Sequence, residues 1–187
     1  PTKWHRAHVT WFFETFVLAD NEPDFAPFQD TYWFLFNSYY EAVGPRYARA
    51  QRGVVSRPGA HDVGVYRDNV DARMRDLVAG LDEGTLAKLS DTIELGFHHE
   101  QQHQELLLMD IKHVLSINPL RPAYVDWSGA GTVSEPDALG WVDVEGGLVE
   151  IGHEGSGFSF DNELPRHQVW LEPFRLADRL VTNGEWL

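Results

Sequence analysis

The sequence contains no cysteine, which excludes disulfide scaffolds, cysteine-based zinc sites and thiol nucleophiles. It has no apolar run near the roughly 20 residues that a helix needs to cross a bilayer, and no signal peptide is visible. Positive charge is scarce: 15 Lys and Arg stand against 29 Asp and Glu, so the formal net charge is −14. Such a chain repels phosphate backbones and anionic lipid surfaces, so we expect neither nucleic acid nor a membrane as a partner. A cytoplasmic location is the default expectation.

Hydrophobic side chains are plentiful, at 43% of 187 residues, and seven residues are Trp. This composition is typical of a folded protein with a sizeable core. The chain lacks an initiating Met, and its last patterned segment, residues 181–187, stops abruptly. We therefore expect a fragment of a longer protein.

Residues 1–125 show apolar side chains at the three- and four-residue spacing that indicates helices. The expected helices cover residues 2–19, 30–43, 61–80 and 85–116. Asp30 is the expected N-cap of the second helix, and the last helix could break near Ser90. Between them, residues 20–29 and the arginine-rich residues 45–60 are expected to be loops.

The pattern changes after the last helix. Residues 126–139 contain Gly and Pro and predict a linker, and the alternating valines from Trp141 onward predict strands. The expected fold class is therefore mainly α: a four-helix bundle over 1–125, the linker over 126–139, and the opening strands of a second domain over 140–187.

The run His99-Glu100-Gln101-Gln102-His103 carries the strongest chemical signal. Positions four apart lie on one face of a helix, so His99 and His103 can bind the same metal ion. The side expected to be buried is marked by Leu95, Leu106, Leu107, Ile111 and Val114. Neutral imidazoles beside this side suit a divalent transition metal, whereas the alternative is a pair of ordinary core or surface histidines.

A metal site in a helical bundle takes its ligands from facing helices. The segment Trp4-His5-Arg6-Ala7-His8 offers two more histidines. His8 continues the apolar side marked by Trp4, Trp11 and Phe12 better than His5 does, so His8 is the predicted third ligand. His5 is expected at the edge.

His-Glu-x-x-His is also the signature of a zinc protease, with Glu100 as general base. The extended signature requires glycine at position 106 and histidine at position 109, where the chain has Leu106 and Met109. A ligand from the linker, such as Glu135, keeps this alternative open as the minor one.

Two long segments, residues 4–16 and 98–112, resemble the sulfoxide synthases of ergothioneine biosynthesis, and residues 39–44 and 57–59 fit the same family. The tail resembles the start of a formylglycine-generating-enzyme-like domain, over residues 146–152, 161–167 and 181–186. The resemblance implies a DinB-like four-helix bundle followed by the truncated start of an α+β sulfatase-modifying-factor domain, which is C-type-lectin-like.

The resemblance further implies a non-haem iron(II) enzyme that acts on small molecules. Such an enzyme uses O2 to join the sulfur of γ-glutamylcysteine, or of cysteine, to the imidazole C2 of hercynine, and it oxidises that sulfur to a sulfoxide. The family pattern assigns the iron to His8, His99 and His103, and it assigns contact with the histidine-derived substrate to Gln102. The catalytic tyrosine belongs to the second domain, so we expect this piece alone to be inactive.

The loop arginines Arg46, Arg49, Arg52 and Arg57 are a further candidate feature. A carboxylate-bearing thiol needs cationic groups, which arginine provides as two-pronged donors. Arg49 and Arg52 are the chosen substrate-binding candidates, and the alternative is a solvated basic loop.

Other functions stay open at this point. The same three histidines would suit a DinB-like thiol transferase with zinc or another divalent metal, or an ovothiol-type 5-histidylcysteine sulfoxide synthase. A non-enzymatic helical binding module is a third alternative. Three histidines also accept either iron or zinc, and the Irving–Williams order does not favour Fe(II).

Overall fold

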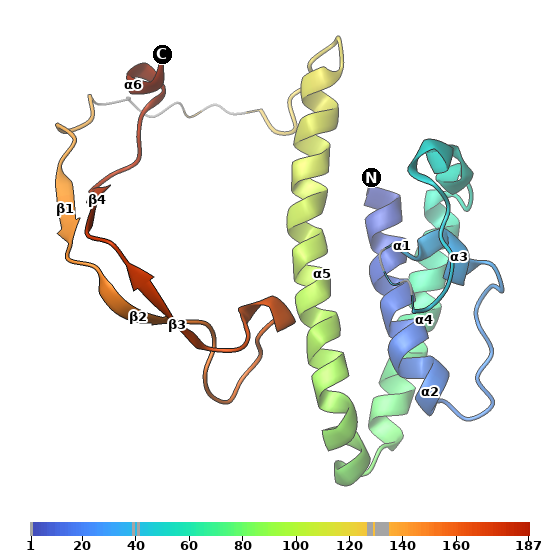
Figure 1. Cartoon of the computed structure of the whole chain (residues 1–187). Coiled ribbons are helices and arrows are strands. Elements are labelled where there is room, and N and C mark those ends of the chain that lie inside the picture. The colour runs from blue at the N-terminus through green and yellow to red at the C-terminus, as the bar shows by residue number, and fades with distance from the viewer. Residues whose placement is uncertain (1, 39, 41, 127–128, 130–134) are drawn as a thin grey trace. The chain divides into compact units, whose positions relative to one another are not determined.

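The computed structural model describes residues 2–38, 40, 42–126, 129 and 135–187, apart from the side chain of Arg49 (Figure 1). The chain divides into two compact units, Pro1–Tyr124 and Val125–Leu187. About 54% of it is helical and its few strands are small and antiparallel, so it is mainly α, as predicted. Within the described residues, no helix combines the length and the apolar character that crossing a bilayer requires.

The first unit is helical. Its elements are α1 (Thr2–Phe13), a π-helical turn (Glu14–Leu18), α2 (Ala19–Asn21), α3 (Tyr32–Phe36), a 3₁₀ helix (Arg49–Ser56), α4 (Ala60–Gly80) and α5 (Glu83–Ile117). The helices predicted over 2–19, 61–80 and 85–116 are therefore confirmed. The break considered near Ser90 is absent, since α5 is continuous there and the Ser90 hydroxyl donates within it to the Ala87 carbonyl at 2.9 Å.

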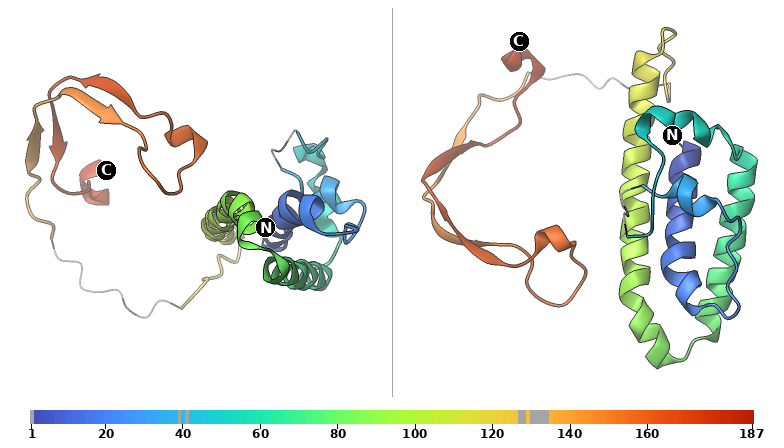
Figure 2. Two further views of the ribbon diagram at one scale, coloured as in Figure 1. Left: turned by 90° about the horizontal axis from the view of Figure 1, so that it is seen from below. Right: turned by 45° about the vertical axis from the view of Figure 1, so that its right-hand side comes forward.

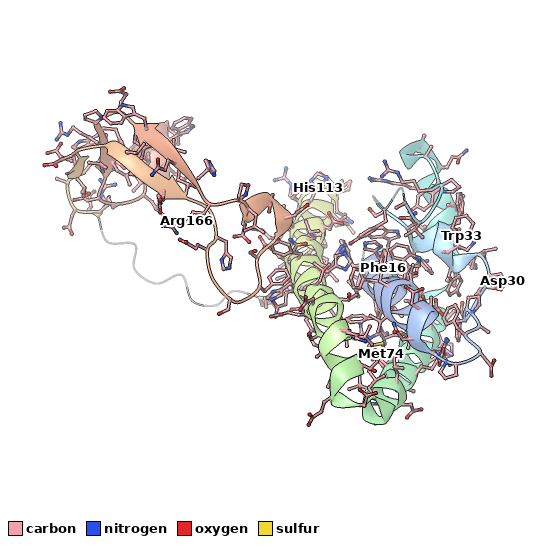
Figure 3. The ribbon with its side chains drawn as sticks, turned by 60° about the horizontal axis from the view of Figure 1, so that its bottom comes forward. Phe16, Asp30, Trp33, Met74, His113 and Arg166 are labelled. Atoms are coloured by element: carbon pink, nitrogen blue, oxygen red, sulfur yellow. The ribbon has the colours of Figure 1, made fainter. Side chains whose placement is uncertain are left out.

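Helix α1 lies at the centre of this unit. It contacts both α4 and α5, and it lies beside both of them in the two views of Figure 2. Its Trp11 and Phe12 are at most 2% exposed and belong to the core. Phe16 and Met74 pack against that core from the π-helical turn and from α4 (Figure 3). Helix α1 thus packs against two helices instead of one, which explains why most of its circumference is buried.

One charged side chain, Glu14, is buried in this core and is 4% exposed. Its carboxylate accepts hydrogen bonds from the Tyr66 hydroxyl at 2.5 Å and from the Phe28 N–H at 2.7 Å. The guanidinium of Arg73 lies 3.5 Å away. A buried carboxylate needs such partners, so Glu14 connects α4 and the loop before α3 to the π-helical turn that follows α1. Burial, together with this carboxylate, raises the pKa of Tyr66 and keeps it a donor.

The helix predicted over 30–43 is wrong in extent. Helix α3 begins at Tyr32, after Thr31, and ends at Phe36, where Asn37 turns to an extended conformation. Aromatic residues are weak helix formers, and the buried Asn37 amide donates to the carbonyls of Tyr40 and Gly44, which stabilises a turn instead. The positions 39 and 41 of the predicted helix lie outside the described residues. Among the described residues, the predicted bundle therefore has three long helical segments and one short one.

The loop predicted over 45–60 is also partly wrong, because it contains the 3₁₀ helix Arg49–Ser56. The ammonium group of Lys3 in α1 donates to the carbonyls of Val55 at 2.6 Å and Pro58 at 2.7 Å. Carbonyl groups at the end of a helix lack partners within that helix. Lys3 therefore attaches the end of this segment to the beginning of α1.

The buried side of α5 agrees only in part with the predicted one, because Leu107 and Ile111 are partly buried whereas Val114 is exposed. Leu95 and Leu106 are 39% and 42% exposed, whereas Gly96 and His99 are buried. A Cβ atom at position 96 would lie 2.6 Å from the Phe13 ring, so only glycine allows α5 to approach α1 this closely. Close packing at Gly96 directs the side of α5 that carries the histidines toward the core.

The second unit is made of antiparallel strands. Its elements are β1 (Trp141–Val144), β2 (Gly147–Ile151), a 3₁₀ turn (Asp161–Glu163), β3 (His167–Leu171), β4 (Phe174–Ala177) and α6 (Asn183–Trp186). Strand β1 pairs with β4, with Trp141 opposite Ala177, and β2 pairs with β3, with Gly147 opposite Leu171. The strands predicted from Trp141 onward are confirmed. Much of the predicted linker, at 127–128 and 130–134, lies outside the described residues.

Candidate metal centre

Three histidines converge inside the helical unit. His8 comes from α1, and His99 and His103 lie one turn apart on α5. Each offers one ring nitrogen, and these three atoms lie within 4.8 Å of one another. His8 is 2% exposed and His99 is 8% exposed, while His103 is partly buried. The fold thus brings the predicted third histidine to the pair that the helical spacing selects.

The ring of His8 is held in one orientation. Its Nδ1 lies 2.5 Å from the carbonyl oxygen of Phe36, which is free to accept because α3 ends at this residue. A carbonyl can only accept, so the proton lies on Nδ1 and Nε2 keeps its lone pair. The ring also stacks between Trp4, at 4.8 Å, and Trp11, at 5.4 Å. His8 is therefore oriented as a ligand before any ion arrives.

The cluster is electrically neutral at pH 7. Burial lowers the pKa of His8 from 6.5 to about 3, and it outweighs the hydrogen bond to Phe36, which raises this pKa. Burial likewise lowers the pKa values of His99 and His103 to about 4. Neutral imidazole is the form that binds a metal ion. The site therefore does not need to lose protons to accept one.

The donor set fits a divalent transition metal. The Nδ1 of His99 is buried and has no hydrogen-bond partner among the described residues. A buried polar atom without a partner costs about 1–3 kcal/mol, and a metal ion is one group that can supply a partner for this ring. Three imidazoles without a thiolate suit iron, zinc, nickel or copper, so the ligands alone leave the choice among them open.

A second layer of side chains supports His103. His5 is 6% exposed, so the expectation that it lies at the edge is wrong. Its Nδ1 lies 2.9 Å from Nδ1 of His103, and its Nε2 lies 3.1 Å from a carboxylate oxygen of Asp110. The sequence could have indicated this arrangement, because Asp110 follows His103 by seven residues, or about two turns, and so lies on the same side of α5. The burial of His5 depends on the approach of α5 to α1.

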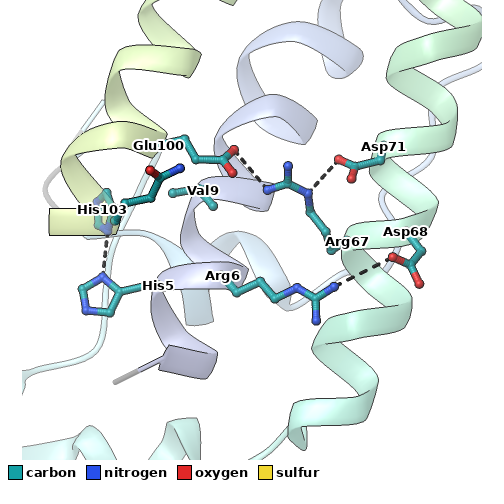
Figure 4. Close-up of a pocket in the computed structure, with 9 residues that line it drawn as sticks. His5, Arg6, Val9, Arg67, Asp68, Asp71, Glu100 and His103 are labelled. Carbon is teal, nitrogen blue, oxygen red and sulfur yellow. Dashed lines mark hydrogen bonds and ion pairs between the residues drawn. The ribbon is translucent and has the colours of Figure 1, made fainter. Parts of the chain in front are cut away.

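A cavity of about 330 Å³ lies beside the cluster, between α1, α4 and α5 (Figure 4). It is lined by His5, Arg6, Val9, Arg67, Asp68, Asp71, Glu100, His103 and Gln104. Across from the histidines, Arg67 forms ion pairs with Asp71 at 2.7 Å and with Glu100 at 3.1 Å. Glu100 would be the general base of a zinc protease, but its carboxylate is held by this arginine. The cavity reaches His5 and, among the three clustered histidines, His103, through mostly polar walls.

In the described part of the chain, no side-chain contact joins the predicted substrate-binding residues to the three histidines. Gln102 is exposed on α5, next to His103, and Arg52 is exposed on the 3₁₀ helix. The side chain of Arg49 lies outside the described residues. Arg46 and Arg57 donate to the nearby carbonyls of Ser38 and Ser56. The assignments of Gln102, Arg49 and Arg52 therefore stay predictions.

Together, the fold and the site define a mainly helical protein with a buried cluster of three neutral histidines that can hold a metal ion. Comparison with protein-family models gives no match. The chain is 28% identical, over 195 aligned residues, to hercynine oxygenase of Mycolicibacterium smegmatis. The alignment covers all of this chain and 41% of that protein. The chain is thus distantly related to a hercynine oxygenase and spans less than half the length of that relative.

Proposed function

We propose that this chain is the metal-binding part of a non-haem iron(II), O2-dependent sulfoxide synthase that joins hercynine to γ-glutamylcysteine or cysteine. The observation that carries the proposal is the convergence of His8, His99 and His103, whose ligand atoms lie within 4.8 Å of one another. The distant relationship to hercynine oxygenase supports the same substrate class. The neutral state of the cluster supports its use as a ligand set for a divalent ion.

The domain assignment belongs to the same proposal. Residues 1–125 would form a DinB-like bundle, residues 126–139 a linker, and residues 140–187 the start of a formylglycine-generating-enzyme-like domain. The described strands support this division, because Trp141, Trp170 and Leu176 are each more than half exposed and offer apolar surface for further packing. In the full-length parent, that packing would complete the second domain and the substrate pocket.

Within this proposal, each described residue has a limited task. The Phe36 carbonyl holds the proton of His8 at Nδ1 and leaves Nε2 for the ion. The stacked rings of Trp4 and Trp11 help to hold the ring of His8 in place. A bound iron(II) ion would supply O2 activation and favour the thiolate form of the sulfur substrate. Gln102 and the arginines Arg49 and Arg52 would orient the two organic substrates.

The proposed reaction balances without a further reductant. It breaks the imidazole C–H and thiol S–H bonds, forms a C–S and an S–O bond, and turns the second oxygen atom of O2 into water. The four electrons that O2 accepts come from forming the C–S bond and from oxidising the sulfur. Product formation and O2 consumption should therefore be equimolar.

The metal centre is tested with Fe(II) alone, under anaerobic conditions, by competition with a chromogenic chelator. Either His99→Ala or His103→Ala should weaken binding by more than about 100-fold, which exceeds the usual effect of changing a supporting residue. His113→Ala is the matched control, because His113 is exposed on the same helix (Figure 3). Equal Fe(II) affinity in all variants would contradict the proposal that these histidines bind the metal.

The activity is tested on the full-length parent, reconstituted anaerobically with Fe(II) and then given hercynine, each thiol and O2. We expect O2 consumption that requires both organic substrates, and a sulfoxide bonded to imidazole C2. A product bonded to C5 would favour an ovothiol-type enzyme, and thiol transfer without O2 consumption would favour a DinB-like thiol transferase. Either result would overturn the proposed activity.

A further inference from the structure

The hydrogen bonds around His5 form a line that ends at the metal centre. Nε2 of His5 lies 3.1 Å from Oδ2 of Asp110, and Nδ1 of His5 lies 2.9 Å from Nδ1 of His103 (Figure 4 shows the second contact). Asp110 and His103 both belong to α5, whereas His5 belongs to α1. The line therefore connects the two helices that supply the histidines of the cluster.

The chemistry of the partners gives this line a direction. An ionised carboxylate can only accept a hydrogen bond, so the proton shared with Asp110 is on Nε2 of His5. An imidazole ring whose single proton is on Nε2 accepts at Nδ1, so in this arrangement the Nδ1–H of His103 donates to Nδ1 of His5. The remaining nitrogen of His103, Nε2, then keeps its lone pair. That lone pair is the one a metal ion requires.

We infer that His5 and Asp110 are positioning residues that fix the tautomer and the ring orientation of His103 for metal binding. This inference rests on the proposed metal centre. Metal-ligating histidines commonly donate their second ring N–H to a carbonyl or carboxylate, which orients them and makes them better ligands. His8 uses the Phe36 carbonyl in this way, and His103 uses His5 and, through it, Asp110.

The burial of the two residues separates their expected effects. His5 is 6% exposed, so it is held by the packing of α1 against α5. The side chain of Asp110 is 55% exposed, so it can be changed with little effect on folding. Substitutions at Asp110 therefore test the hydrogen-bonded line itself, and substitutions at His5 test the line together with the packing.

The experiment measures Fe(II) affinity, anaerobically, and the tautomer of His103 in the metal-free chain, by long-range ¹H–¹⁵N correlation. His5→Phe keeps an aromatic ring but removes both hydrogen bonds, and should weaken Fe(II) binding by about 10–100-fold. Asp110→Asn should weaken it by about 10-fold, the lower end of that range, and should give a mixture of His103 tautomers. Asp110→Glu retains an acceptor-only group, so it should keep the Fe(II) affinity and the His103 tautomer of the unaltered chain.

Glu105→Gln is the control, since Glu105 is exposed on the same helix, and it should change neither readout. If Asp110→Asn leaves both the affinity and the His103 tautomer unchanged while His103→Ala loses Fe(II), the positioning role is overturned and the metal centre stands. If His103→Ala binds Fe(II) as tightly as the unaltered chain, the metal centre itself fails. Should His5→Phe not fold, the Asp110 variants decide the question.

Discussion

The two units of this protein differ in how far their large aromatic side chains are exposed to solvent. In the helical unit, Trp11 and Tyr66 are 0% exposed, while in the strand unit Trp141 and Trp170 are 51% and 63% exposed. No described residue of the second unit is buried. A low pKa caused by burial, a fixed tautomer and a water-excluded ligand set all require a buried environment. Only the first unit has one, and all three histidines of the cluster are there.

The comparison is tested most strongly by removing one indole from each unit. Trp11→Ala should lower the free energy of unfolding of the helical unit by about 3–5 kcal/mol, because it leaves a large cavity in the core. Trp170→Ala removes an exposed ring and should change the free energy of unfolding of the strand unit by less than about 0.5 kcal/mol. Urea unfolding followed by helical circular dichroism measures the first value, and amide hydrogen exchange of β3 measures the second. Similar losses for the two variants would contradict the contrast between the units.

Acid should destabilise the helical unit when no metal is present. The unfolded chain protonates these histidines near pH 6.5, but burial lowers the pKa of His8 to about 3 and those of His99 and His103 to about 4. The unfolded state therefore binds more protons as the pH falls through this window. Each histidine should then reduce the unfolding free energy by up to about 1.4 kcal/mol per pH unit.

This pH effect is measured by urea unfolding in a chelating buffer at several values between about pH 7.5 and about pH 5. His8→Gln should make the pH dependence shallower, because one of the three contributions is gone. An unfolding free energy that stays constant across this range would show that the histidines are not neutral in the folded state.

The close approach of α5 to α1 is tested at Gly96. Gly96→Ala places a Cβ atom 2.6 Å from the Phe13 ring and should destabilise the helical unit by about 1–3 kcal/mol. Gly80→Ala, at the end of α4, meets no atom within 4 Å and should be neutral or stabilising by up to about 1 kcal/mol. Thermal unfolding of the two variants gives both values. A neutral Gly96→Ala would mean that the helices are packed less tightly.

The smallest effect is expected in the strand unit. Asp143 and Arg175 form an ion pair at 3.0 Å, but their side chains are 81% and 62% exposed. Exposed ion pairs contribute about 0–1 kcal/mol, and salt screens them. Asp143→Asn should therefore change stability by less than about 1 kcal/mol, and the change should vanish at about 1 M NaCl. A larger, salt-independent loss would indicate that this pair is buried by further packing.

Much of the helical unit could be predicted from the sequence. The bounds of α4 and α5 and the pairing of His99 with His103 depend on spacing along one helix, which backbone hydrogen bonds determine within four residues. The choice of His8 over His5 as the third cluster member also followed from one apolar face. The extent of α3 was mispredicted, because its end depends on the hydrogen bonds of Asn37 to residues that come later in the chain.

The sequence by itself determined which residues lie one helical turn apart, because that relation is local to each helix. Tertiary structure decided which side of α5 is buried, since the approach of two helices depends on the space that Gly96 leaves for Phe13. It also decided that His5 is buried between His103 and Asp110. Burial and hydrogen-bond direction arise only when separate surfaces meet, and these two properties give the histidine cluster its neutral, oriented form.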